Sequence, residues 1–160
     1  VKSLFGYLRK FKLVPEYWSF VDVGSGFGKM VFHASLEDDV TKATGIELME
    51  SKHVIANKNL KELSDEFDEF PSEKVRLFHG SSDDFKELNY SVVFHNSIAW
   101  ESKTIKNLNS ISLNSIHITT KAPVAIYDRR IEYLETFNIK FSWSKPDKLT
   151  PVYVYKLSNK

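Results

Sequence analysis

Three glycines lie within five residues, directly after a short apolar run. The segment reads Asp22-Val-Gly24-Ser25-Gly26-Phe-Gly28 and holds half of the six glycines in the chain of 160 residues. Glycine is needed where φ is positive or where the backbone must approach a ligand closely. The spacing G-x-G-x-G differs from the dinucleotide-binding G-x-G-x-x-G and from the Walker phosphate loop. We therefore expect a ligand-binding turn, and Asp22 should favour a cationic amino group over a phosphate.

A second carboxylate closes the next apolar run. Glu47 ends the segment Ala43–Glu47, 19 residues after Gly28, and Leu48 follows it. A carboxylate at the end of a second strand can accept two hydrogen bonds from vicinal ribose hydroxyls. A ribose beside Glu47 and an ammonium group beside Asp22 together describe S-adenosylmethionine as the cofactor. The alternative is an ordinary strand–helix turn with two solvated carboxylates.

Short apolar runs alternate with amphipathic stretches along the chain, as in a parallel sheet with crossover helices. The expected strands are Ser19–Val23, Ala43–Glu47, Val75–His79, Ser91–His95 and Ser115–Thr120. The expected helices are Leu4–Leu13, Lys29–Glu37, Ser51–Phe70, Glu101–Leu108 and Ile126–Phe137. Apolar alternation from Phe137 to Trp143, a K-P-D-K turn and the run Val152–Leu157 predict a C-terminal antiparallel hairpin.

The length and this alternation predict one α/β domain over residues 1–160. It divides into an N-terminal helix region (1–18), a cofactor-binding core (19–135) and the C-terminal hairpin (136–160). The absence of cysteine excludes a disulfide framework and a thiolate metal site, and the five histidines lack metal-ligand spacing, so no metal is expected.

Charge and hydropathy limit the classes of partner. The 22 basic and 21 acidic residues give a net charge of +1, which argues against a strongly basic nucleic-acid clamp. No apolar run approaches the ~18 residues of a membrane span, and the first residues show no signal-peptide pattern. We expect a cytoplasmic or nuclear protein without a membrane partner, and the sequence leaves the oligomeric state open.

The glycine turn with the acid after the second strand resembles the class I S-adenosylmethionine-dependent methyltransferases, over about Val14 to Leu157. The resemblance implies a Rossmann-like, doubly wound, seven-stranded sheet with helices on both faces. Its strand order would be 3-2-1-4-5-7-6, with the last strand antiparallel. The expected C-terminal hairpin agrees with that order.

The residues after the fourth strand narrow the subclass. Residues 92–100 read V-V-F-H-N-S-I-A-W, without the [DN]-P-P-[YF] motif of adenine and glutamine methyltransferases. The run is similar to the N-N-F-A-F segment of the disruptor-of-telomeric-silencing (Dot-one-like) family of histone lysine methyltransferases. F-V-D-V-G-S-G-F-G (20–28), G-I-E (45–47), T-T-K-A-P (119–123), S-W-S (142–144) and P-V-Y-V-Y (151–155) resemble motifs of that family in the same order.

Two departures from this family bear on the site. The family shows G-D-F after strand three, where the acid meets the adenine amine, whereas residues 80–85 read G-S-S-D-D-F. Asp83 is therefore the candidate, with Gly80, Ser81 and Ser82 beside it. The family also carries a long N-terminal helical region, whereas about 18 residues precede the first strand here. Either the sequence is a core fragment, or its lid and substrate differ.

Methyl transfer from a sulfonium is an in-line displacement that needs alignment and, for lysine, a neutral amine. Residue types suited to an acceptor channel are Asn96, which would also lie beside the cofactor, Trp100, Trp143, Tyr153 and Tyr155. The alternative for the aromatic residues is core packing. The first hypothesis is a methyltransferase acting on a protein lysine side chain. The alternatives are an RNA or small-molecule methyltransferase, or a non-catalytic cofactor-binding module that serves a partner.

Overall fold

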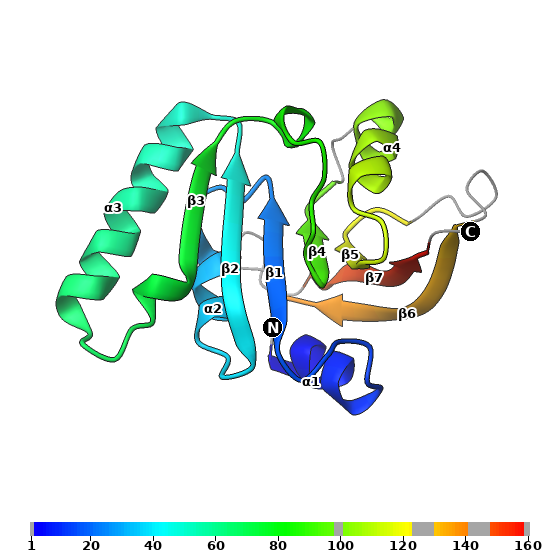
Figure 1. Ribbon diagram of the computed structural model, residues 1–160, viewed down its shortest axis with the longest axis horizontal. Coiled ribbons are helices and arrows are strands. Elements are labelled where there is room, and N and C mark those ends of the chain that lie inside the picture. The colour runs from blue at the N-terminus through cyan, green and yellow to red at the C-terminus, as the bar shows by residue number, and fades with distance from the viewer. Residues whose placement is uncertain (1, 98–100, 123–129, 141–147, 159–160) are drawn as a thin grey trace.

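A computed structural model describes residues 2–97, 101–122, 130–140 and 148–158. Its described part contains one seven-stranded sheet of order β3-β2-β1-β4-β5-β7-β6 (Figure 1), which confirms the predicted order. Neighbours from β3 to β5 are parallel, and β7 is antiparallel to both β5 and β6. The strands are β1 (Trp18–Val23), β2 (Val40–Glu47), β3 (Val75–His79), β4 (Val92–His95), β5 (Ile116–Thr119), β6 (Ile131–Ile139) and β7 (Thr150–Leu157).

Helices cover both faces of the sheet. The α-helices are α1 (Lys2–Lys10), α2 (Lys29–Ser35), α3 (Glu50–Glu66) and α4 (Ser102–Ile111). Two short 3₁₀ helices, η1 (Ser72–Lys74) and η2 (Ser82–Asp84), flank β3. Phe20 of β1 joins the core cluster with α1 and α2, whereas Val21 and Val23 join the cluster with α4. Because both faces of β1 are buried, its sequence is a nearly continuous apolar run.

All four described α-helices end at a residue other than the predicted one; α2 ends at Ser35 rather than Glu37, and α4 at Ile111 rather than Leu108. The first helix ends at Lys10 rather than Leu13, and Lys12 has a positive φ of 52° that no helix continues through. The third ends at Glu66, since Phe67 has an extended backbone (φ −128°, ψ 101°). Phe70 is nevertheless buried and packs edge-on against Phe32 of α2, with ring centroids 6.1 Å apart. Because Phe70 is apolar, the helical periodicity of the sequence continues to it, beyond the end of the helix itself.

The predicted helix Ile126–Phe137 is wrong over its described part, where β6 begins at Ile131. The pairing of β6 with β7 shifts between Tyr133 and Glu135, which leaves Leu134 as an extra residue. Leu134, Phe137 and Ile139 all pack against the core. This bulge produces a three-residue step between apolar residues that imitates helical periodicity. The antiparallel hairpin is confirmed, but its first strand begins earlier than predicted; Phe141 and Trp143 lie outside the described residues.

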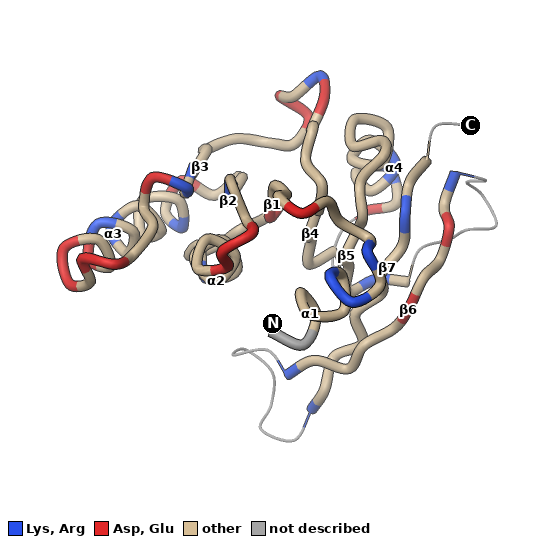
Figure 2. The backbone as a smooth tube through the Cα atoms, turned by 60° about the horizontal axis from the view of Figure 1, so that its bottom comes forward, with Lys and Arg blue, Asp and Glu red and all other residues tan. Residues whose placement is uncertain are grey.

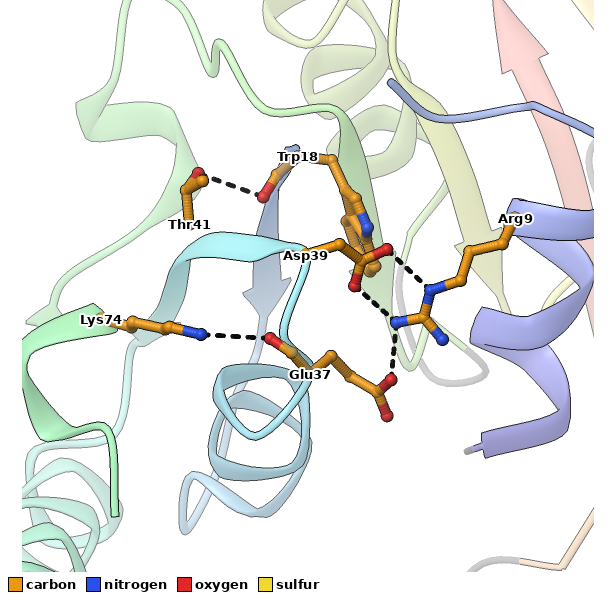
Figure 3. A network of polar contacts seen from close by, with 6 residues as sticks. All are labelled: Arg9, Trp18, Glu37, Asp39, Thr41 and Lys74. Carbon is orange, nitrogen blue, oxygen red and sulfur yellow. Dashed lines mark hydrogen bonds and ion pairs between the residues drawn. The ribbon is translucent and has the colours of Figure 1, made fainter. Parts of the chain in front are cut away.

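A network of ion pairs and hydrogen bonds connects α1 with the start of β1 (Figure 3). The Arg9 guanidinium donates to both carboxylate oxygens of Asp39, at 2.7 and 2.6 Å, and to Glu37 at 2.6 Å. The hydrogen bonds from Arg9 lower the pKa of the Asp39 carboxyl. The amide of Trp18 donates to the Asp39 carbonyl at 3.0 Å, and the Lys74 ammonium donates to the Glu37 carbonyl at 3.1 Å. The network thus joins α1, β1, η1 and the turn that precedes β2.

None of the helices in the ranges described above is long and apolar enough to cross a membrane.

Candidate active site

The glycine turn joins the end of β1 to the start of α2 along a left-handed backbone path. Gly24, Gly26 and Gly28 have φ angles of 79°, 56° and 85°, which residues with a side chain rarely adopt. Gly28 is the N-cap of α2, and a Cβ atom there would lie 2.6 Å from the Phe32 ring. Backbone conformation and close packing both require glycine at that last position.

Three consecutive residues at the end of β2 hold this turn. Gly45 leaves room for Ser25, whose Oγ lies 2.7 Å from the position that a Cβ of residue 45 would take. The Ile46 carbonyl accepts hydrogen bonds from the amides of Gly24 and Ser25, at 2.8 and 3.1 Å. The amide of Gly26 is bonded to the next residue of β2, so these three amides are all used within the protein. The turn therefore does not offer these three N–H donors to a ligand.

The carboxylate of Glu47 is buried at the end of β2, with 6% of the residue exposed. Its Oε2 accepts from the Gly26 amide at 2.7 Å, and its Oε1 accepts from the Met49 amide at 2.8 Å. Each oxygen of a carboxylate has a second acceptor site. The two backbone bonds fix the orientation of the group and leave it able to accept hydrogen bonds from ligand hydroxyls.

Asp22, at the end of β1, is a buried acid whose Oδ1 has no hydrogen-bond partner among the residues that the structure describes. Desolvation by burial, with a smaller effect from the charge of Glu47, raises the pKa of Asp22 to about 8. The carboxyl therefore keeps its proton at neutral pH unless a cation comes close to it. An orphaned buried acceptor of this kind suits a ligand with an ammonium group.

A cavity of about 390 Å³ opens beside these groups, a size typical of small-ligand sites. Its lining residues come from β1, the glycine turn, α2, α3 and the end of β4: Asp22, Gly24, Ser25, Gly26, Phe27, Lys29, Met30, Lys52, Phe94 and Asn96. The sequence did not single out Phe27, Lys29, Met30, Lys52 or Phe94 as site residues, although Phe27 and Phe94 lie within the motifs 20–28 and 92–100. Lys52 follows Glu47 by five residues and Phe94 precedes Asn96 by two, so only proximity along the chain could have indicated them.

The remaining predicted cofactor residues are outside the lining of this cavity, in the glycine turn and at the ends of β2 and β3. The Gly80 amide donates to the Glu47 carbonyl at 3.0 Å, which joins the two strand ends. Ser81 caps η2, and Asp84 accepts from the Ser81 amide at 2.8 Å, whereas the Asp83 side chain is exposed. Residues outside the cavity lining but at these strand ends or in the turn are Gly28, Glu47, Leu48, Gly80, Ser81, Ser82 and Asp83.

The structure separates the predicted acceptor residues. Asn96 lines the cavity beside Asp22, and its Oδ1 accepts from the Thr120 hydroxyl at 2.7 Å. Tyr155 is buried on the α4 side of the sheet, where it stacks on His117 and donates to Asn109 of α4. Tyr153 is half-buried on β7 opposite Thr119, near the end of β5. Trp100 and Trp143 lie outside the described residues.

A second cavity of about 580 Å³ lies between α4 and the ends of β4, β5 and β6. Lys106, Lys121 and Arg130 line it together with hydroxyl groups, including Ser97, which is hydrogen-bonded to Thr119 at 2.6 Å. His95 is also in the lining, and burial keeps its pKa well below the usual range. The cations of this cavity are therefore its lysine and arginine side chains rather than an imidazolium.

Comparison with family models identifies the family of the chain. The family described as "Histone methylation protein DOT1" matches residues 3–126, which include the glycine turn, Glu47 and Asn96. The chain belongs to the DOT1 family. No curated protein matches the chain in sequence.

Solved structures share the fold of this DOT1-family protein at low sequence identity. An RNA methyltransferase from Salinibacter ruber bound to S-adenosyl-L-homocysteine has a TM-score of 0.65 and 17% identity, over 100% of this chain and 94% of its own. A candidate methyltransferase from Escherichia coli, YhhF, has a TM-score of 0.70 and 16% identity, over 99% and 86%. A candidate RNA methyltransferase from Pyrococcus horikoshii has a TM-score of 0.66 and 14% identity, over 98% and 80%.

The DOT1-family protein is a class I S-adenosylmethionine-dependent methyltransferase. The residues present fit that cofactor: an orphaned buried carboxyl for an ammonium group, an oriented carboxylate for a pair of hydroxyls, and a glycine-rich turn between them. Bound S-adenosylmethionine supplies an electrophilic methyl group on a sulfonium. The protein's task is to orient the acceptor and to exclude water.

Proposed function

We propose that this protein methylates a side chain of a protein, with lysine as the first acceptor. The observation that carries the proposal is Asn96, at the end of β4, in the same cavity as Asp22 and the glycine turn. Its Oδ1 is held by Thr120 and keeps one acceptor site. A neutral amide at this place can orient an amine without adding a charge that would hold the amine in its ammonium form. The family description, histone methylation, supports the same class of substrate.

Each site residue has a role in this proposal. Asp22 receives the cofactor's ammonium group, and Glu47 accepts from its ribose hydroxyls. Gly80, Ser81, Ser82 and Asp83 adjoin the adenine, and the exposed Asp83 is the candidate partner of the adenine amine. Tyr153, half-buried on β7, and Tyr155, which lines the 580 Å³ cavity beside α4, are the candidate aromatic acceptor residues among those described.

The proposal is tested with methyl-labelled S-adenosylmethionine and purified core histones or native extract. We expect label in protein that resists nuclease, is released by protease, and elutes as methyl-lysine after acid hydrolysis. The initial rate should rise about tenfold per pH unit below the lysine pKa of about 10.4, because only the neutral amine reacts. An Asn96→Ala variant should lower the rate without a matching loss of cofactor affinity. Label that nuclease releases would contradict the protein substrate.

Methylation of RNA is the second candidate, and the 580 Å³ cavity beside α4 favours it. Its lysine and arginine side chains, with several hydroxyls, are suited to phosphate groups. A Lys106→Glu substitution should then abolish methylation of RNA, whereas methylation of a protein lysine should be nearly unaffected. Cofactor binding without turnover on protein, RNA and small-molecule panels would instead favour a non-catalytic module that serves a partner.

Replacing Glu47 with alanine should weaken S-adenosylmethionine binding about tenfold or more, because each charge-assisted hydrogen bond contributes about 1.5–3 kcal/mol. Isothermal titration calorimetry measures the change. Glu50→Ala is the matched control: it removes an exposed carboxylate three residues away, in the first turn of α3, and should leave the affinity unchanged. Equal affinity of the Glu47 variant and the natural protein would refute the placement of the ribose.

A further inference from the structure

An apolar groove lies between α2 and the end of α3, on the sheet face that also carries α1. Its volume is about 530 Å³, and its floor is formed by Phe32 and Phe70. Two apolar residues in the lining are exposed to solvent: Leu36 is 57% exposed and Phe67 is 51% exposed. Exposed apolar groups gathered along one groove, rather than scattered singly, mark a contact site for another molecule.

The end of this groove at α3 is acidic. Glu69 is in the lining, Glu66 and Asp68 flank Phe67, and Asp38 follows Leu36 by two residues. All four carboxylates are exposed, and none has an ion-pair partner within the described ranges. Figure 2 shows acidic residues gathered along the end of α3 and on the segment after α2.

The opposite end is basic, since Lys29 of α2 lines it. Lys29 also lines the cofactor cavity, so the groove runs away from the cofactor turn toward the acidic end. An occupant that satisfies both features needs apolar side chains on one face and cations near one end. An amphipathic helix or strand rich in lysine and arginine has this chemistry.

We propose that the groove between α2 and α3 docks a lysine- and arginine-rich amphipathic segment of a partner protein. The apolar face of the segment covers Leu36, Phe67 and the aromatic floor. Its cations meet Glu66, Asp68 and Glu69. This goes beyond the proposed methylation. Docking here requires no transfer of a methyl group, and it uses none of the carboxylates assigned to cofactor binding.

Fluorescence anisotropy with three labelled 18-residue helical peptides tests the proposal. The first carries leucines at i, i+3, i+4 and i+7 with lysine elsewhere, the second replaces lysine with glutamate, and the third replaces leucine with serine. We expect the leucine–lysine peptide to bind with a Kd of roughly 10 μM and the other two at least tenfold more weakly. Binding should weaken as salt rises from 50 to 300 mM, because exposed charges are screened.

Matched variants locate the binding. Leu36→Ser should reduce affinity for the leucine–lysine peptide at least fivefold, whereas Val54→Ser, at a residue of α3 that is 58% exposed, should not. Asp68→Lys should reduce it similarly, whereas Glu87→Lys, at an exposed residue before β4, should not. Thermal unfolding of each variant checks that it is folded.

Three outcomes would overturn the proposal. The first is equal binding of the lysine and glutamate peptides, which would show no selection by the acidic end. The second is binding that the Leu36 and Asp68 variants leave unchanged, or no binding at ~200 μM protein. The third is self-association of the natural protein that Leu36→Ser abolishes, which would assign the groove to a second copy. Because the readout is peptide binding, a failure here leaves the methylation test unaffected.

Discussion

Asp22→Asn is expected to make the unliganded protein more stable at alkaline pH while it weakens cofactor binding. Burial raises the pKa of Asp22 in the folded protein to about 8 from an ordinary value of 3.8. Between these values the folded state holds a proton that the unfolded chain has lost. The free energy of unfolding must therefore fall as pH rises from about 4 to 8, by at most about 1.4 kcal/mol per pH unit, and level off above 8.

Asparagine has nearly the same shape as aspartate but no titratable group. The free energy of unfolding of the variant should therefore not fall between about pH 4 and 8 on account of residue 22. We expect the variant to be more stable by about 2–4 kcal/mol at pH 8.5 and within about 1 kcal/mol of the natural protein at pH 5. Urea unfolding at the two pH values measures the difference. Asp38→Asn, at an exposed carboxylate, is the control and should change neither value by more than ~0.5 kcal/mol.

The same variant should bind S-adenosylmethionine about 10- to 100-fold more weakly, because the proposed ammonium contact would lose its charge. Calorimetry at pH 6.5 in buffers of different ionisation enthalpy adds a second readout. The natural protein should release a proton when the cation binds, and Asp22→Asn should release less. A variant that keeps both the affinity and the proton release would exclude Asp22 as the ammonium partner.

Gly28→Ala is expected to produce the largest loss of stability among the glycine substitutions. Its φ of 85° is unfavourable for alanine, and the added Cβ would lie 2.6 and 2.8 Å from two carbons of the Phe32 ring. Phe32 cannot retreat freely, since it packs against Phe70. Strain and overpacking together should cost about 2–4 kcal/mol, measured by urea unfolding.

Substitutions at two other glycines separate the contribution of backbone strain from that of close packing. Gly26 has a φ of 56° but nothing within 4 Å of an added Cβ, so Gly26→Ala should cost only about 1 kcal/mol of backbone strain. Gly6 is in α1 with open space around it, so Gly6→Ala should stabilise the protein by up to about 1 kcal/mol. If all three variants lose similar stability, the close packing at Gly28 is not the cause of its requirement.

The sequence predicted the parallel half of the fold well because its central strands β1 and β4 are buried on both faces and form short apolar runs, although β3 at the edge of the sheet is only partly buried. Ser19–Val23 and Val75–His79 reproduce β1 and β3 within one residue, and the glycines mark the turn between β1 and α2. The end of the sheet was harder, because the bulge at Leu134 gives β6 a three-residue apolar step. Period alone cannot distinguish this step from a helix, and only pairing with β7 resolves it.

Some residues of the site could likewise be predicted from the sequence, and others could not. Asp22 and Glu47 could be found because their place at the ends of consecutive strands is readable along the chain. The surroundings of Tyr155 could not be predicted, since the face on which a strand residue lies depends on registers set by distant partners. Here β7 pairs with both β5 and β6, and Tyr155 is directed toward α4. Lys52 lies in no motif, and Phe94 lies in a motif that did not single it out, so only the folded chain shows both at the cofactor cavity.

The hydrogen bonds that the amides of the glycine turn donate to β2 should slow hydrogen exchange in the turn. A surface loop ordinarily exchanges its amide hydrogens quickly, because local openings cost little. The amides of Gly24, Ser25 and Gly26 all donate to the last residues of β2, in the interior of the sheet. They become accessible to solvent only when β2 parts from the turn, so they should exchange as slowly as the central strands, even though Gly24 itself is exposed.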